Sequence, residues 1–355
     1  MRESQESAEA IGAVDAGLAE GGLTHGQRRT RTGAWKDGER IKLPRSANAA
    51  PRKRRKQAVP DAPGVLSIPA WEKLPWLRAG FSMRQGGAST AYGDGELNLG
   101  WTKEDDSAIV ARNRQRFVQA VAGESKMELA AVRQFHSGMV QIIEKDHGQL
   151  VKPDGRAVLR GDGLMTNVPG VLLGVQTADC IPVLVADKRT RAVAAFHAGW
   201  RGTLARIVER GVGTMRLRYG SRPEDLVAAV GPGIGACCYA VGEEVRSEFE
   251  SQFAYAPELF TEVYDSDPVR KKYPLLFLTA RAPGHSNIGP QIHIDLWEAN
   301  RRQLLDAGLR QKNITVTAEC SGCARGKNGE RSYFSHRMEH GYTGRMMAVI
   351  GVAGR

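Results

Sequence analysis

The sequence predicts an α+β fold, in which one folded domain of mixed β-sheets carries its helices on the outside and follows a tail. Short apolar strands outnumber helical segments and arrive in runs, whereas a regular strand–helix alternation would indicate a purely parallel sheet. Gly at 41 of 355 positions is typical of a globular chain with many tight turns. No apolar run approaches the roughly 18 residues of a membrane-spanning helix. The sequence therefore predicts a folded domain without a membrane segment.

Residues 1–63 are expected to form a disordered basic tail. They hold 13 Lys and Arg against 8 Asp and Glu, which gives +5 of the net charge of +11. Within 28–56 the count is 12 basic against 2 acidic residues, with few aromatic residues and no apolar periodicity. We interpret this stretch as a solvated tail, because no folded recognition element accompanies the charge. The alternative is weak, salt-sensitive contact with nucleic acid or another polyanion.

The domain is expected to span 64–355 and to begin near Val65. Its first helix is predicted over 105–122, where apolar residues recur at helical spacing behind acidic residues that favour a helix start. Short apolar runs then predict five strands, at 131–136, 139–144, 170–176, 181–187 and 192–198.

The second half of the domain is predicted to contain three further helices and three further strands. The helices are expected at 202–220, 243–253 and 293–309, the last ended by Gly308. The strands are expected at 226–235, 314–320 and 345–353. Five prolines within 254–290 indicate a long irregular loop or insertion.

Three residues in the middle of the chain are candidates for one metal site. His136 lies in RQFHSGMV, Cys180 ends GVLLGVQTADC, and His197 follows the apolar run AVAAF. Two imidazoles and a thiolate suit zinc or copper, which prefer nitrogen and soft sulfur to oxygen. With three such ligands a fourth position stays open to water or substrate, which is the pattern of a catalytic zinc. Taken singly, each residue also fits an ordinary buried thiol or a satisfied core histidine.

The cysteines also predict a compartment. Five cysteines, an odd and small number, fit a reducing environment, and the N-terminus lacks the basic-then-apolar order of a secretion signal, so we expect a cytoplasmic protein. Cys320 and Cys323 form a CxxC that invites comparison with a zinc ribbon completed by Cys237 and Cys238. An adjacent Cys-Cys pair is not the second CxxC of such a site. We therefore interpret these four cysteines as structural, without a metal.

From about Gly80 to Gly351 the sequence resembles a known family. The strings that carry the resemblance are FSMRQGGAS (81–89), QFHS (134–137), TNVPGVLLGVQTADCIPVL (166–184), AAFHAGWRGT (194–203), GPGIGACCYAVGEEV (231–245) and YFSHRMEHGYTGR (333–345). They resemble the multicopper polyphenol oxidase (laccase-like) family, also known as peptidoglycan editing factors or laccase-domain purine nucleoside phosphorylases. TADC followed by HAGWRG is the most specific part of the match.

The resemblance implies an α/β/β/α sandwich of two sheets and a metal held by the positions matching His136, Cys180 and His197. It also implies phosphorolysis of adenosine, inosine, guanosine and 5′-methylthioadenosine, together with deamination of adenosine. The implied partners are purine nucleosides and phosphate. Where the family has Ala-Asp-Ala or Ala-Asp-Gly, this chain has Gly161-Asp162-Gly163, so the aspartate is in place. The usual Arg-Arg pair is Arg337-Met338 here, so only its first arginine carries over.

Phosphorolysis needs cationic groups for phosphate. Arg84 in SMRQGG, Arg337 in SHR and Arg201 in GWRG are the candidates, because guanidinium donates to phosphate in a fixed two-pronged geometry. Each of them also fits a surface or structural ion pair. His336, next to Arg337, is expected to border the pocket.

Other side chains near the metal motif have predicted roles. Asp179, beside the cysteine, is expected either to orient a histidine ligand or to handle a proton, as a member of the catalytic set with His136, Cys180 and His197. Gln134 and Ser137 are expected to bind ribose or base. The metal has two predicted uses, activation of water for attack on C6 of adenine and positioning of phosphate or nucleoside.

Two other enzymatic functions and one binding function stay open. A copper-dependent polyphenol oxidase is disfavoured as a blue-copper laccase, because the sequence has one His/Cys set and no HxH pairs for a trinuclear cluster. A hydrolase that edits peptidoglycan precursors would use the same activated water. A nucleic-acid-binding function rests only on 28–56. The sequence does not decide the oligomeric state.

Overall fold

The structure, a computed structural model, describes residues 62–146, 148–152, 154–263 and 291–354. The expected tail over 1–63 lies outside the described residues except for its last two positions, and so does most of the expected insertion, 264–290. Their disorder and any polyanion contact therefore stay predictions. Within the described residues, no helix combines the length and the apolar character that crossing a membrane requires.

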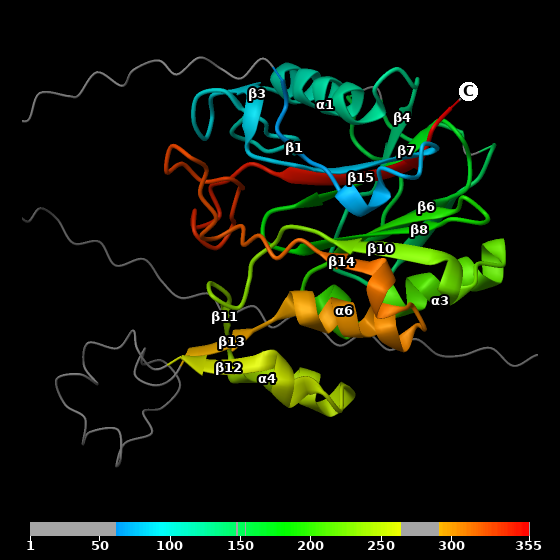
Figure 1. Ribbon diagram of the computed structural model, residues 1–355. Helices are drawn as coiled ribbons and strands as arrows, with labels where there is room; N and C mark the ends of the chain where they lie inside the picture. The colour runs from blue at the N-terminus through cyan, green and yellow to red at the C-terminus, as the bar shows by residue number, and fades with distance from the viewer. Residues whose placement is uncertain (1–61, 147, 153, 264–290, 355) are drawn as a thin grey trace, which may run out of the picture. The chain divides into compact units, whose positions relative to one another are not determined.

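Two mixed β-sheets form the centre of the domain (Figure 1). The five-stranded sheet has the order β1 (Val65–Leu66), β2 (Leu77–Ser82), β15 (Met346–Val352), β7 (Val171–Thr177), β4 (Glu128–Ala131). The six-stranded sheet has the order β14 (Ile314–Val316), β10 (Leu226–Val230), β8 (Ile181–Asp187), β9 (Val193–Ala198), β6 (Gly163–Thr166), β5 (Val140–Ile143). The pairs β4–β7, β5–β6 and β10–β14 are parallel, and the other pairs in these sheets are antiparallel.

The two sheets pack against each other through alternate side chains. In β9, Val193 and Ala195 belong to the apolar layer between the sheets, whereas Ala194 and Phe196 face the helices. Both faces of this strand are buried. That burial explains why the central strands read in the sequence as continuous apolar runs.

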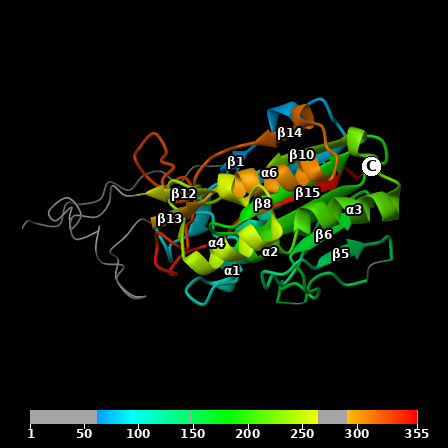
Figure 2. The ribbon, with the colours of Figure 1, turned by 90° about the horizontal axis from the view of Figure 1, so that it is seen from below.

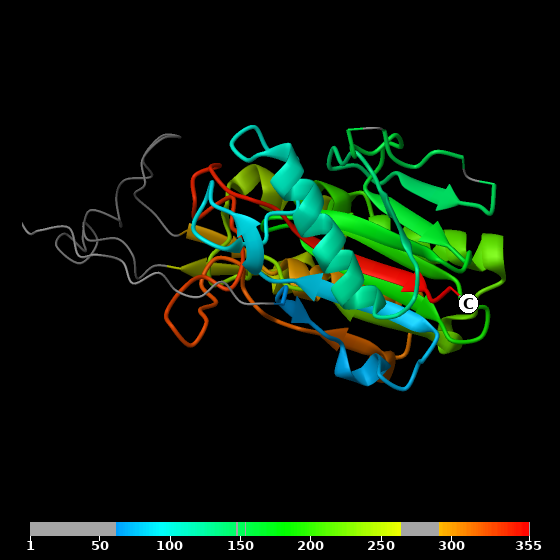
Figure 3. The ribbon, with the colours of Figure 1, turned by 90° about the horizontal axis from the view of Figure 1, so that it is seen from above.

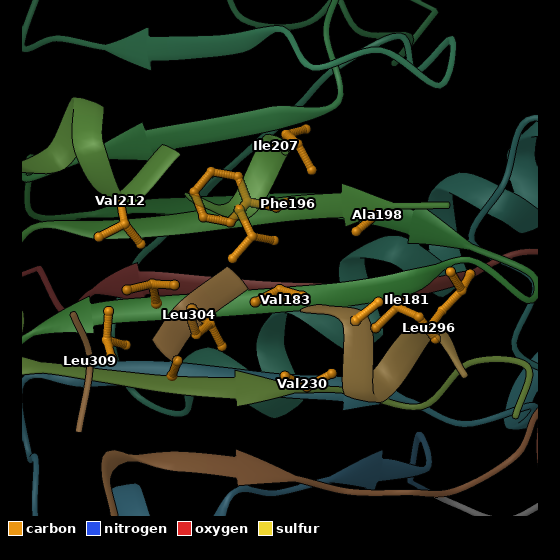
Figure 4. Close-up of a cluster of buried hydrophobic side chains, with 14 of the residues drawn as sticks. Ile181, Val183, Phe196, Ala198, Ile207, Val212, Val230, Leu296, Leu304 and Leu309 are labelled. Atoms are coloured by element: carbon orange, nitrogen blue, oxygen red, sulfur yellow. The ribbon is translucent and has the colours of Figure 1, made fainter. Parts of the chain in front are cut away.

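Helices cover the outer face of each sheet. α1 (Ser107–Ala122) packs on the five-stranded sheet (Figure 3). Its Phe117 belongs to an apolar cluster with Leu172 and Val349. α3 (Ile207–Tyr219) and α6 (Leu296–Asp306) pack on the six-stranded sheet (Figure 2). The close-up in Figure 4 shows Phe196 and Val183 of the sheet against side chains of these two helices. The layer order is α/β/β/α, so the predicted fold class is confirmed.

The remaining elements are small. A three-stranded antiparallel sheet has the order β11 (Ala240–Val241), β13 (Gln291–Ile294), β12 (Phe260–Val263). Among the described residues, the other regular elements are β3 (Gln85–Ser89), α2 (Trp200–Leu204), α4 (Glu243–Gln252) and 3₁₀ turns at Pro69–Trp71, Pro223–Asp225, Ala256–Leu259 and Gln311–Asn313.

The elements differ from the sequence prediction in several places: β2 and β6, for example, were not predicted, and β14 ends at Val316 and not at Cys320. The strand expected over 131–136 is wrong, since only Ala131 belongs to a strand, as the last residue of β4. The backbone N–H groups of 135–137 donate to a side-chain carboxylate and not to a neighbouring strand. The helix expected over 202–220 is two helices, since Arg206 adopts a left-handed φ of 55°. The last helix begins at Leu296, where the side chain of Asp295 caps it by accepting the N–H of Glu298.

Candidate active site and metal centre

The three predicted metal ligands meet where the chain passes from one sheet to the other. Cys180 lies in the short connection from β7 to β8, and His197 lies in β9, which pairs with β8. His136 is in the loop that follows β4. Candidate ligand atoms of the three residues all lie within 4.8 Å of one another. The structure therefore brings together residues that are up to 61 positions apart in the sequence.

The donor set fits a zinc ion. Zinc binds nitrogen at about 2.0–2.1 Å and thiolate sulfur at about 2.3 Å, so ligand atoms around one ion lie roughly 3–4 Å apart. His197 is buried, Cys180 is half-buried and His136 is exposed, which leaves one side of the group open to a pocket. Copper accepts the same donors. The arrangement thus suits a metal with one position free for water or substrate.

The carboxylate of Asp162 holds two of these ligands in place. Its Oδ1 accepts hydrogen bonds from Nδ1 of His197 and from the backbone N–H of His136, both at 2.9 Å. Its Oδ2 accepts from the backbone N–H and from the hydroxyl of Ser137, both at 2.7 Å. Because Nδ1 of His197 is engaged, Nε2 is the nitrogen available to a metal. His136 has a left-handed φ of 62°, a conformation that these backbone hydrogen bonds stabilise.

The same contacts set the charges of the group. Burial raises the pKa of the Cys180 thiol, but the charge of His197 and hydrogen bonds from both imidazoles outweigh it and lower that pKa to about 6. Burial lowers the pKa of His197, but the charge of Cys180 and the hydrogen bond to Asp162 raise it to about 9. Burial raises the pKa of Asp162, yet hydrogen bonds from His197 and Ser137 hold it well below its usual range. Cys180 is thus a thiolate at neutral pH, the form that binds metals.

Gly199 gives the ligands the space they occupy. A Cβ atom at this position would lie 2.7 Å from the sulfur of Cys180 and 3.3 Å from Cδ2 of His136. The first glycine of HAGWRG is therefore required by its close packing against the ligands. Its backbone does not require glycine, because its φ of −69° is open to any residue.

A pocket of about 590 Å³ opens onto the three ligands, a size typical of small-molecule sites. Its lining is strongly cationic, with Asp179 as the one carboxylate among the described residues. The lining arginines are Arg114, Arg133, Arg156, Arg201, Arg337 and Arg345, and the lining aromatic residues are Trp101, Trp200 and Tyr239. His336 also lines the pocket, as expected. This environment favours an anionic ligand that also carries a flat ring.

Two of the predicted phosphate ligands lie in this pocket. The guanidinium of Arg201 stacks at 4.2 Å on the ring of Trp200. The guanidinium of Arg337 lies 5.1 Å from the ring of Tyr239 and donates to the carbonyl of Ala240 at 2.7 Å. Stacking holds each guanidinium in one orientation at the pocket wall.

The third, Arg84, lies elsewhere, which is at odds with the predicted phosphate contact. Its guanidinium donates to Glu96 and to Glu339, both at 2.6 Å, and lies 4.7 Å from the ring of Phe334. The residue is 7% exposed and is not among the residues that line the pocket. Two carboxylates satisfy its charge, so Arg84 ties together distant parts of the chain.

Three other predicted site residues have structural partners. The carboxylate of Asp179 accepts from the hydroxyl of Ser321 at 2.6 Å and from the backbone N–H of Arg337 at 2.7 Å. The predicted role of orienting a histidine falls to Asp162 instead. The Gln134 side chain donates to the carbonyl of Gln176 at 2.8 Å and accepts its N–H at 2.7 Å, although Gln134 also lines the pocket. The hydroxyl of Ser137 donates to Asp162, so both side chains fix the loop that carries His136.

Comparison with known proteins identifies the family of this chain. Residues 78–353 match the family described as "Multi-copper polyphenol oxidoreductase laccase". "Purine nucleoside phosphorylase YlmD" of Geobacillus stearothermophilus is 33% identical over 290 residues, which cover 79% of this chain and 95% of that protein. "Purine nucleoside phosphorylase" of Deinococcus radiodurans is 36% identical over 289 residues, which cover 79% and 94%.

Two further relatives extend the comparison. "Adenosine deaminase RL5", from an unknown prokaryotic organism, is 34% identical over 211 residues, which cover 59% of this chain and 70% of that protein. The crystal structure of the Bacillus licheniformis hypothetical protein YfiH superposes with a TM-score of 0.67 at 29% identity, covering 82% of this chain and 97% of that one. The match over most of the folded domain shows that this chain belongs to the multi-copper polyphenol oxidoreductase laccase family.

Proposed function

We propose that this protein is a zinc-dependent purine nucleoside phosphorylase that also deaminates adenosine. The observation that carries the proposal is the meeting of His136, Cys180 and His197 in the lining of a cationic, aromatic-lined pocket. Two relatives named purine nucleoside phosphorylase and one named adenosine deaminase support it. A zinc ion held by the three ligands supplies a Lewis acid and lowers the pKa of water, which suits both reactions.

The arginines of the pocket are the proposed phosphate site. Phosphorolysis brings an anionic nucleophile to C1′ of the ribose and leaves negative charge on the departing purine. Arg201 and Arg337 are held on aromatic rings at the pocket wall and present guanidinium groups to a phosphate. The other lining arginines add to a positive potential that stabilises both charges.

The aromatic residues are the proposed purine site. Trp200 and Tyr239 line the same pocket as the two arginines, so a base stacked on a ring would place its ribose near the phosphate. Burial, together with the charge of Cys180, raises the pKa of Tyr239 to about 12. Its hydroxyl therefore stays protonated at neutral pH and is able to donate a hydrogen bond to the base.

The two other enzymatic functions, polyphenol oxidation and hydrolysis of peptidoglycan precursors, have less support. A multicopper oxidase needs several copper ions, but within the described ranges only one group of potential ligands contains histidine. A hydrolase acting on peptidoglycan precursors would use the same three ligands, yet no observation favours that substrate. The six lining arginines fit phosphate better than they fit a neutral phenol.

A product assay tests the proposal. The purified protein is incubated with inosine or adenosine, with and without phosphate, after loading with zinc or copper. We expect phosphate-dependent release of hypoxanthine and ribose 1-phosphate from inosine, and phosphate-independent formation of inosine from adenosine. Oxidation of a catechol by the copper-loaded protein, without base release by the zinc-loaded protein, would contradict the proposal.

A further inference from the structure

Four cysteines that the sequence analysis interpreted as structural, without a metal, come together in the fold. The sulfur atoms of Cys237, Cys238, Cys320 and Cys323 all lie within 4.8 Å of one another. The sulfurs of Cys237 and Cys323 are 3.5 Å apart, far longer than a disulfide bond of about 2.05 Å. The interpretation of these residues as structural cysteines without a metal therefore does not account for their arrangement.

Two turns create this cluster. Cys237 and Cys238 lie in a turn closed by the N–H of Cys238 on the carbonyl of Gly235 at 2.9 Å. Cys320 and Cys323 flank a second turn, closed by the N–H of Ala324 on the carbonyl of Cys320 at 2.9 Å. The thiols of Cys237 and Cys238 both lie next to those of Cys320 and Cys323, so a second CxxC is not needed to bring four sulfurs together. This is the feature that the spacing argument missed.

The surroundings are those of a metal-bound thiolate. The sulfur of Cys320 accepts the backbone N–H of Gly235 at 3.3 Å, a hydrogen bond of the kind that stabilises thiolate ligands. A Cβ at Gly322 would lie 2.9 Å from Cβ of Cys238, so only glycine lets the two turns approach this closely. Cys320 is buried whereas Cys237 and Cys323 are exposed, which gives an ion a path from solvent.

Positively charged side chains near the four cysteines also favour a metal bound by thiolates. Four thiolates and one divalent cation carry a net charge of −2. Arg331 donates to the carbonyl of Gly322 at 2.6 Å, and Arg325 donates to the carbonyl of Ala324 at 3.1 Å. Both guanidinium groups therefore lie on the turn over residues 320–324, where they offset that charge.

We propose that Cys237, Cys238, Cys320 and Cys323 bind a second zinc ion, separate from the one at His136, Cys180 and His197. Four sulfurs around zinc at about 2.3 Å form a tetrahedron with edges of about 3.8 Å, and small adjustments of the present spacing reach that shape. With four protein ligands the site is closed to substrate, which is the pattern of a structural zinc.

This zinc would fix one wall of the active-site pocket. Tyr239, which lines the pocket, directly follows Cys238. Ser321, between the other two cysteines, donates its hydroxyl to Asp179, the residue before Cys180. The ion would thus join two segments that are 82 positions apart, of which one is followed by a pocket residue and the other donates a hydrogen bond to one.

Metal stoichiometry and X-ray absorption of the zinc-loaded, full-length protein test the proposal. The wild type should hold about two zinc ions, and the double variant C180A/H136A should keep about one. The absorption spectrum of that variant should show four sulfurs at about 2.3 Å and no histidine nitrogen.

The variant C320S/C323S should also keep about one zinc ion, and its Tm should fall by at least about 5 °C, because structural zinc contributes to folding. Met338→Leu, a change beside Gly322 that removes no thiol, should keep two ions.

The proposal is overturned if C180A/H136A holds no zinc while its remaining thiols react freely. It is equally overturned if mass spectrometry finds a disulfide between Cys237 and Cys323 in protein that was isolated under reducing conditions with zinc present. If a cysteine variant fails to fold, the wild type alone decides the matter. If the wild type holds two zinc ions with five sulfur ligands in total, one at the first site and four at the second, the second site is supported. If it holds one zinc ion with a single sulfur ligand, the second site is excluded.

Discussion

Asp162 accepts the Nδ1–H of His197 at 2.9 Å, and the same oxygen accepts the backbone N–H of His136 at 2.9 Å. A single carboxylate therefore sets the orientation of one candidate ligand and the backbone of another. A metal ligand needs such an outer partner to fix its tautomer and its direction. The preorganisation of the site depends on Asp162 more than on the aspartate beside the cysteine.

The variant Asp162→Asn should weaken zinc binding at this site by about 10–100-fold, because an amide is a poorer acceptor for both N–H groups. Competition with a chelator measures the affinity. Asp179→Asn is the matched control, since Asp179 contacts Ser321 and Arg337 in place of the histidines. Its left-handed φ of 93° also suits asparagine. Equal loss of affinity in both variants would contradict the assignment.

Gly199→Ala should expel the metal without unfolding the domain. The new Cβ would lie 2.7 Å from the sulfur of Cys180, closer than packing allows. We expect loss of this zinc ion in metal analysis and a Tm within several degrees of the wild type. Gly213→Ala, in α3 with nothing within 4 Å of the new Cβ, is the control and should stabilise the protein by about 0.5–1 kcal/mol. Full zinc occupancy in Gly199→Ala would show that the ligands bind in another arrangement.

Zinc binding to the metal-free protein should release protons in a defined way. With a pKa of about 9, His197 is protonated at pH 7.5, whereas Cys180, with a pKa of about 6, is already a thiolate. The ion must therefore displace about one proton from this pair, and that proton comes from the histidine. Below pH 6 the thiol is protonated as well, so affinity should fall steeply on acidification. Calorimetry in buffers of different ionisation enthalpy counts the protons that zinc binding releases. A zinc affinity that rises below pH 6 would contradict the ion pair between His197 and Cys180.

Arg201→Ala should raise the KM for phosphate by at least about 10-fold, while adenosine deamination, which uses no phosphate, should change far less. Kinetics with inosine at several phosphate concentrations, beside the deamination assay, separate the two effects. Arg201→Lys keeps the charge without the two-pronged geometry and should recover part of the loss. A uniform loss in both reactions would assign Arg201 to nucleoside binding.

Arg84→Ala should instead destabilise the fold. It leaves Glu96 and Glu339 without their partner in a region where the arginine side chain is 8% exposed, and breaking a buried ion pair costs about 3–5 kcal/mol. Urea unfolding measures this cost. Wild-type stability combined with a selective loss of phosphorolysis would restore Arg84 to the phosphate site.

The apolar runs predicted the central strands because strands buried on both faces leave a continuous signal in the sequence. The runs before Cys180 and His197 became β7 and β9, and the ligands lie at their ends. The ion pairs of Arg84 were not predicted because one of its partners, Glu339, is 255 positions away, and no local pattern reports such a pairing. Asp162 was visible as a retained aspartate, but its contact with His197 depends on the pairing of β6 with β9. The four-cysteine cluster likewise required two turns to meet across 82 positions.

The Cys180→Ala variant tests most directly whether the site at His136, Cys180 and His197 is the seat of catalysis. Turnover of inosine with phosphate and of adenosine is measured together with zinc content and Tm. The apolar core around β8 and β9 is intact in this variant, so we expect a Tm within a few degrees of the wild type, the loss of one zinc ion, and a fall of at least about 100-fold in both activities. Retention of both activities in the folded variant would contradict the account.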